Sequence, residues 1–170
     1  AAAFVPLIGE MDGPVTMRIS RAGTIPVHKE DESLKVGKGI ERRNGTDVTI
    51  IACGSMVGRS MRTAELLAEK GIDAGVVDLP TIKPLDADLI CKVAARTGAV
   101  VTAEEHSIIG GLGSAVAEVL GEKQPTPMQR VGITDTFTRT ALDPDSLMDA
   151  YGLSIDRIVK SVEDVLKEKE

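Results

Sequence analysis

One pattern recurs from residue 47 onward: a short apolar run, then a stretch with apolar residues at helical spacing. An almost wholly apolar run is typical of a strand covered on both faces, as in a parallel sheet. The predicted strands are residues 47–52, 73–79, 99–103 and 128–133. The predicted helices are residues 57–70, 86–97, 113–120 and a final amphipathic helix that Ser154 caps. The pattern predicts an α/β fold, a three-layer αβα sandwich with a mostly parallel sheet of about five strands.

The dipeptide Asn44-Gly45 is a hairpin signal, because both central residues of a type I′ turn need a positive φ. It joins a short predicted strand, residues 37–42, to the first long apolar run. We therefore expect a hairpin here, which adds one antiparallel edge strand to the sheet.

The chain upstream of residue 36 has a different pattern. Residues 1–13 have the pattern of a helix end and a loop, and residues 15–20 alternate apolar and polar positions like a half-buried strand. That strand has no predicted neighbour within the chain, so we expect its sheet to lie elsewhere. Residues 28–35 are charged and indicate a linker. The expected division is a tail and linker at residues 1–35 and a domain at residues 36–170.

Composition narrows the function classes. The 170 residues carry a net charge of −6 with a pI near 5.0, which disfavours nucleic acid as a partner. No apolar run approaches the length of about 20 residues that a membrane-spanning helix needs. The two cysteines and two histidines are scattered and predict no metal site, and free cysteines favour a reduced, cytoplasmic protein.

Ser55 follows the first core strand in the sequence Cys53-Gly54-Ser55. Such a serine most often caps the next helix, but free backbone N–H groups at a helix start also bind anions. Cys53 has no histidine beside it, so a buried free thiol is expected rather than a nucleophile.

A second candidate follows the third core strand, where Glu104, Glu105 and His106 precede a glycine-rich turn. The turn consists of Gly110, Gly111, Leu112, Gly113 and Ser114. Its glycines allow close backbone approach to an anion, although it lacks the dinucleotide-binding pattern. The alternative is a tight turn with Ser114 as a cap and His106 bonded to a neighbouring carboxylate. His106 at an interface is a third interpretation.

Arg21 ends the upstream strand and is a candidate for binding phosphate through its guanidinium fork. From spacing alone, a solvated surface arginine is the better interpretation.

Several phrases, in this order and spacing, resemble the C-terminal part of transketolase-type thiamine diphosphate enzymes. They are Gly13–Arg21, Asp47–Val57, Ile82–Asp86, Val101–His106 with Gly110–Val116, and Arg130–Ile133 with Phe137 and Tyr151–Leu153. Gly13–Arg21 looks like the last strand of the family's pyrimidine-binding domain, and the remainder looks like its C-terminal domain.

The resemblance implies that the parent enzyme binds thiamine diphosphate and Mg²⁺ between its diphosphate-binding domain and the pyrimidine-binding domain of a partner subunit. The diphosphate motif and the activating glutamate are absent from this sequence, so no catalytic residue and no bound cofactor are expected in this chain alone. The expected partners are the N-terminal regions of the same enzyme and a second subunit, giving a homodimer. Arg21 matches a position that contacts the sugar-phosphate substrate.

The implied activity is that of a transferase which moves a two-carbon ketol unit between sugar phosphates, as in pentose phosphate metabolism. Deoxyxylulose-phosphate synthase and the beta subunit of 2-oxo acid dehydrogenases share the domain and are the alternatives. The sequence Ser20-Arg21-Ala22-Gly23 departs from the Ser-Arg-Gln-Asn common in transketolases. A stand-alone anion-binding or interaction domain is the alternative of another class.

Overall fold

The structure is a computed structural model, and it describes residues 2–20, 23–29, 32–141 and 143–169. Its centre is a five-stranded sheet with the strand order β1-β3-β2-β4-β5. Four of the strands run parallel: β2 (Val48–Ala52), β3 (Ala74–Asp78), β4 (Val100–Ser107) and β5 (Met128–Ile133). The edge strand β1 (Ile40–Arg43) is antiparallel to β3. The predicted fold class is confirmed.

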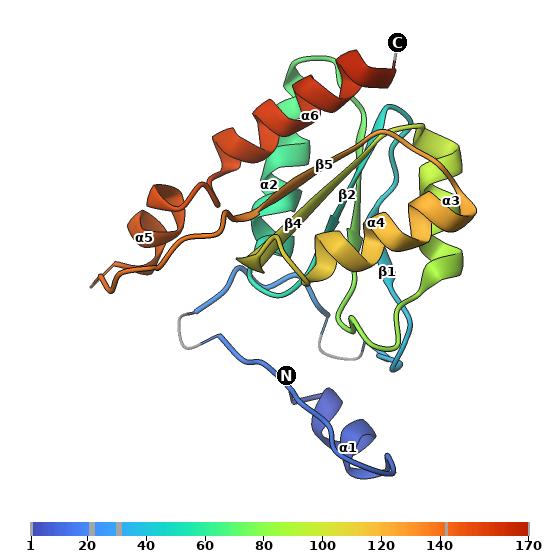
Figure 1. The fold of residues 1–170 in the computed structure, drawn as a ribbon, viewed down its shortest axis with the longest axis vertical. Helices are drawn as coiled ribbons and strands as arrows, with labels where there is room; N and C mark the ends of the chain where they lie inside the picture. Colours follow the sequence, from blue (N-terminus) through green and yellow to red (C-terminus); the bar gives the residue numbers. More distant parts are fainter. Residues whose placement is uncertain (1, 21–22, 30–31, 142, 170) are drawn as a thin grey trace.

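Two pairs of helices cover the two faces of the sheet (Figure 1). On one face lie α2 (Met56–Glu69) and α6 (Ile155–Lys169), and on the other lie α3 (Ala87–Thr97) and α4 (Leu112–Lys123). The short helices α1 (Phe4–Gly9) and α5 (Pro144–Ala150) lie outside this sandwich. The sequence pattern predicted all four covering helices to within a few residues.

The sequence of the central strand β2 is almost wholly apolar because both faces of the strand are buried. Ile50 belongs to the core cluster under α2 and α6, and Ile51 belongs to the one under α3 and α4. Successive side chains of a strand point to opposite faces, and here both faces are covered. We call the cluster under α2 and α6 the first core cluster, and the cluster under α3 and α4 the second core cluster.

The hairpin prediction at Asn44-Gly45 is wrong in its pairing. β1 pairs with β3 rather than with β2, so the two residues lead the chain across the amino end of β3. A Cβ on Gly45 would stand 2.0 Å from the backbone nitrogen of Gly75. Gly45 therefore allows the two backbones to pass close to each other. The expected antiparallel edge strand is present as β1, but it pairs with β3 instead of β2.

The predicted strand at residues 15–20 does not form, because no strand of the described chain lies beside it to complete a ladder. Further along, the upstream segment contacts the domain. A Cβ on Gly58 of α2 would stand 2.6 Å from Cβ of Ile25, and Val27 packs against the first core cluster. The segment is thus held against the end of α2.

Asp86 connects the start of α3 to the segment just before β1. Its carboxylate accepts hydrogen bonds from the backbone of Leu89, which caps α3, and from the backbone of Gly39, just before β1. Ser154 caps α6 as predicted, with its Oγ accepting from Arg157 N at 3.1 Å. No helix in the described part of the chain is both long and apolar enough to cross a membrane.

Candidate functional site

In open α/β sheets, ligands bind at the carboxyl ends of the strands, in the crevice where the strand order reverses. Here the order reverses between β2 and β4, since β2 connects onward to β3 on one side and β4 lies on the other. Ser55 follows β2 and lies across this crevice from Glu104 and Glu105, which lie in the second half of β4. The sequence candidates at these two loops are therefore brought together.

The Ser55 hydroxyl donates a hydrogen bond to the Glu105 carboxylate at 2.5 Å. Ser55 occupies the cap position of α2 without making the side-chain cap bond. Arg18 Nη2 reaches the Glu105 carbonyl oxygen at 3.5 Å from the upstream segment. Side chains of the chain itself thus bridge the crevice, and the expected cap role of Ser55 is replaced by this bridge.

Glu104 is buried, with 1% of its surface exposed. Its two carboxylate oxygens accept hydrogen bonds from the backbone nitrogens of Leu112 and Gly113, each at 2.7 Å. A Cβ on Gly111 would stand 2.0 Å from Glu104 Oε2, so the glycine makes room for the carboxylate. The anion at the start of α4 is the chain's own Glu104, which argues against a free anion site at Gly111 and Gly113.

The remaining turn residues hold one another. Gly110 N donates to Ser114 Oγ at 3.0 Å, and Ser114 Oγ donates to the Ile108 carbonyl at 3.1 Å. Ser114 therefore ties the turn together instead of capping α4, whose cap position is Gly111. His106 Nδ1 donates to the Ser107 carbonyl at 2.8 Å and stands 3.9 Å from Glu104, so the expected hydrogen bond to a carboxylate is absent. An interface role for the half-exposed His106 stays a prediction.

Cys53 is a free thiol at the same edge of the sheet. Burial raises the pKa of the Cys53 thiol to about 12, and the carboxylates of Glu104 and Asp78 add to the rise. A thiol with such a pKa is protonated at neutral pH and is a poor nucleophile. This agrees with the expectation of an inert thiol, although the Cys53 residue is half-buried rather than fully buried.

Arg21 lies outside the described residues, so its expected contact with a substrate phosphate stays a prediction. Within the described ranges, no three His, Cys, Asp or Glu side chains gather as a metal site would need.

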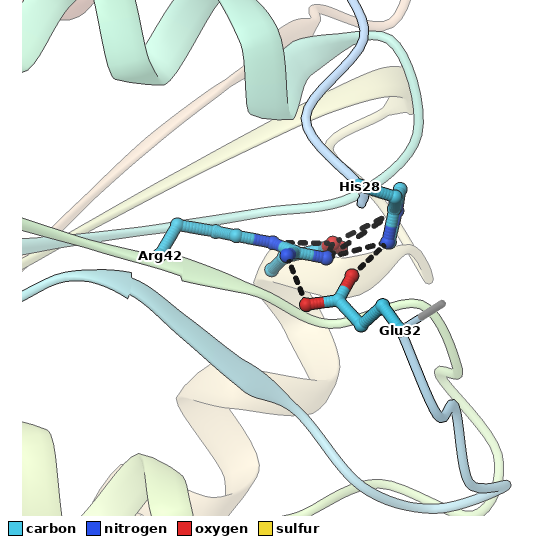
Figure 2. A network of polar contacts seen from close by, with 4 residues as sticks. His28, Glu32 and Arg42 are labelled. Carbon is cyan, nitrogen blue, oxygen red and sulfur yellow. Dashed lines mark hydrogen bonds and ion pairs between the residues drawn. The ribbon is translucent and has the colours of Figure 1, made fainter. Parts of the chain in front are cut away.

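A charge network that the sequence did not reveal lies at the end of β3, where Figure 2 shows His28, Glu32 and Arg42 in mutual contact. Arg42 Nη1 donates to Glu32 at 2.6 Å, and Arg42 Nη2 donates to Asp78 at 3.0 Å. His28 lies 2.7 Å from Glu32 and 3.3 Å from Asp78. The network therefore attaches the upstream segment to β1 and β3.

The two domain residues of this network are almost fully buried, with 8% of the Arg42 side chain and 3% of the Asp78 side chain exposed. Burial raises the pKa of the Asp78 carboxyl, and the Arg42 guanidinium acts against that rise. The hydrogen bond from Arg42 lowers the pKa of the Glu32 carboxyl. Residues this far apart along the chain leave no local pattern, although His28 and Glu32 at a spacing of four residues were a partial signal.

Comparison with known proteins gives a consistent picture. The family model for the transketolase C-terminal domain matches residues 37–158. A 6-deoxy-6-sulfo-D-fructose transketolase subunit of Clostridium sp. (strain MSTE9) is 44% identical over 168 residues, covering 99% of this chain and 52% of the relative. A 1-deoxy-D-xylulose-5-phosphate synthase of Desulforudis audaxviator is 42% identical over 158 residues, covering 91% of this chain and 25% of the relative.

Among solved structures, a split-gene transketolase described as an inactive beta4 tetramer superposes with a TM-score of 0.94 at 43% identity. The match covers 99% of this chain and 55% of the solved one. The chain thus spans about half the length of the transketolase relatives it matches. On the family match and these identities, the chain belongs to the transketolase C-terminal domain family.

Proposed function

We propose that this chain is the C-terminal section of a transketolase-type enzyme, which transfers a two-carbon ketol unit between sugar phosphates, and that it is inactive alone. The observation that carries the proposal is similarity along nearly the whole chain, upstream segment included, to a protein named as a transketolase subunit. The solved split-gene transketolase supports the same view.

The geometry of the crevice between β2 and β4 supports a structural rather than a catalytic role for the domain. Ser55, Glu105 and Glu104 use their hydrogen-bonding groups on one another and on the start of α4. Cys53 is protonated at neutral pH because burial raises its pKa to about 12. The domain at residues 36–170 then supplies structural support and subunit contacts.

Thiamine diphosphate and Mg²⁺ belong to the parent enzyme in this proposal. The described residues do not fit these groups: they offer no cluster of three metal-ligating side chains, and the diphosphate motif is absent from the sequence. The N-terminal diphosphate-binding and pyrimidine-binding regions of the same enzyme would hold the cofactor, so no catalytic step is assigned to this chain.

Residues 1–35 are, in this proposal, the end of the pyrimidine-binding domain and the linker that follows it. Val15 and Ile19 are exposed at 42% and 65%, as expected of side chains that pack against a region of the parent protein. The network of His28, Glu32, Arg42 and Asp78 fixes the linker on the domain. A homodimeric parent and a cytoplasmic location complete the proposal, the latter resting on two free cysteines.

The test is reconstitution with the N-terminal section from the same organism. Neither section alone should transfer a ketol unit from xylulose 5-phosphate to ribose 5-phosphate, whereas an equimolar mixture with thiamine diphosphate and Mg²⁺ should do so. Arg21→Gln should raise KM for the phosphorylated substrates, and Arg62→Gln, at an exposed position of α2, is the control. Turnover by this chain alone would overturn the proposal.

Deoxyxylulose-phosphate synthase is the second candidate, favoured by identities of 42% over 158 residues to such an enzyme. The same mixture distinguishes the two activities. Condensation of pyruvate with glyceraldehyde 3-phosphate, without ketol transfer between sugar phosphates, would select this alternative.

A further inference from the structure

Two separate contacts hold residues 23–29 and 32–36 of the upstream segment on the domain, one apolar and one charged. The apolar contact is made by Ile25 at the start of α2, where Gly58 leaves room for it. The charged contact is made by Glu32 with Arg42 of β1. A single contact would let the segment swing, whereas two separate contacts fix both its position and its direction.

The apolar contact depends on the absence of a side chain at Gly58. The three atoms nearest to a Cβ built there all belong to Ile25, at 2.6, 3.2 and 3.3 Å. The closest of them, Ile25 Cβ, is bonded to the backbone and cannot rotate away, so relief would require the segment or α2 to move. Gly58 lies inside α2, where alanine favours the helix more than glycine does. The space at Gly58 therefore serves the segment at the expense of the helix.

The charged contact is prepared by the domain itself (Figure 2). Arg42 donates from Nε and Nη2 to Asp78 Oδ2, at 3.3 and 3.0 Å, and the Asp78 side chain is 3% exposed. This pair leaves Arg42 Nη1 for Glu32 Oε1, which lies 2.6 Å away. An arginine that one carboxylate already orients loses less entropy when it binds a second one. The domain therefore presents a preformed site for the carboxylate of the segment.

Both contacts can be removed while the core of the domain stays intact. The pair of Arg42 and Asp78 lies within the domain, so it persists when Glu32 loses its charge. Replacing Arg42 instead would leave the buried Asp78 carboxylate without its partner and would destabilise the domain. On the apolar side, a methyl group at Gly58 meets Ile25 before any other residue. Attachment of the segment is thus separable from the stability of the domain.

We propose that Gly58 and Arg42 are positioning residues: they hold the upstream segment in one orientation and so fix the direction in which the pyrimidine-binding region of the parent enzyme meets this domain. The inference rests on the proposed function, in which residues 1–35 include the end of that region. Arg18, further upstream, reaches the Glu105 carbonyl at 3.5 Å and adds a third contact. A displacement of about 1 Å can cost a reaction about a hundredfold in rate, so a loosened segment should slow the transfer.

The first measurement uses the purified chain and does not depend on activity. NMR order parameters of the backbone amides in residues 23–29 should be about 0.85 in the parent chain and below about 0.6 in Glu32→Gln and in Gly58→Ala. The order parameters of β2 should stay at their parent values in both variants. The urea midpoint should stay within about 0.3 M of the parent for Glu32→Gln and should not fall for Gly58→Ala.

Two matched controls make the same chemical changes elsewhere. Glu10→Gln removes a carboxylate at an exposed position of the upstream segment. Gly121→Ala adds a methyl group to α4, where a Cβ meets open space. Both controls should keep the parent order parameters in residues 23–29.

The second measurement uses the mixture with the N-terminal section, thiamine diphosphate and Mg²⁺, at saturating concentrations of that section so that weaker assembly does not contribute. Glu32→Gln and Gly58→Ala should each lower kcat for ketol transfer about tenfold to a hundredfold. A residue that only stabilised the domain would not lower kcat at an unchanged urea midpoint. The two controls should turn over like the parent.

Parent order parameters in both test variants, or an equal fall in both controls, would overturn the attachment. Parent kcat in a variant whose segment has become mobile would overturn the positioning role. Absence of transfer in the parent mixture would instead remove the proposed function, and the order parameters would still decide whether Gly58 and Arg42 hold the segment.

Discussion

Replacing Glu104 by glutamine tests whether a buried carboxylate holds the start of α4. The carboxylate accepts from two backbone N–H groups, those of Leu112 and Gly113, at 2.7 Å each. A glutamine side chain of the same shape offers one oxygen and one NH₂ group. One of the two backbone donors would then face another donor in a site from which water is excluded.

The expected cost follows from these contacts. A hydrogen bond to a charged acceptor contributes about 1.5–3 kcal/mol, and a buried donor without a partner costs about 1–3 kcal/mol. Losing the negative charge at a helix start adds about 0.3–1 kcal/mol. Because these contributions overlap, we expect Glu104→Gln to lower the free energy of unfolding by about 2–4 kcal/mol, a large part of a typical total of about 5–15 kcal/mol.

Urea unfolding followed by circular dichroism measures this difference. With a typical m-value, the midpoint should fall by about 1–2 M. Glu118→Gln on the exposed side of α4 is the control and should change the free energy of unfolding by less than about 0.5 kcal/mol. If Glu104→Gln unfolds at the parent midpoint, the carboxylate does not support the helix, and the turn becomes available again as a site for an external anion.

Three further predictions concern the sheet edge and the outer helices. Gly45→Ala should destabilise the domain by about 1–3 kcal/mol in urea unfolding, because the new methyl group meets the backbone of β3, whereas Gly121→Ala, which has open space around it, should stabilise α4 by about 0.5–1 kcal/mol. The hydrogen bond from Lys92 lowers the pKa of Glu41 below its usual 4.5, so its contribution is present above that pH and is lost as the pH falls through the folded-state pKa; Glu41→Gln should therefore flatten the loss of stability below pH 4.5, an effect of about 1 kcal/mol or less. Arg59→Met should speed amide hydrogen exchange in α5 without changing exchange in β2, since Arg59 holds α5 through two aspartates.

The core of the fold was predictable because its signal is local. Ile50 and Ile51 are adjacent and apolar, a pattern typical of a strand whose two faces are both covered. α5 was missed, although Asp143 followed by Pro144 is a start signal: Asp143 accepts from Ser146 N at 3.0 Å.

The errors arose where contacts distant in sequence decided the outcome. Asn44-Gly45 has the composition of a tight turn, but the approach of Gly45 to Gly75 routes the chain past β3. At the candidate site, the sequence showed a carboxylate near a glycine-rich turn and suggested an external anion. Only the three-dimensional structure shows that Glu104 folds back to fill that place itself.

The position of α6 in the chain also governs how the protein can fold during synthesis. Ile158, Val162 and Val165 of this last helix belong to the first core cluster together with residues of β2 and α2, which are made about a hundred residues earlier. Until α6 leaves the ribosome, one face of the sheet is only half covered, and its apolar side chains are accessible to chaperones or to other nascent chains. The domain thus completes its fold only after α6 has been translated, and ribosome stalling within this helix would leave an aggregation-prone nascent chain.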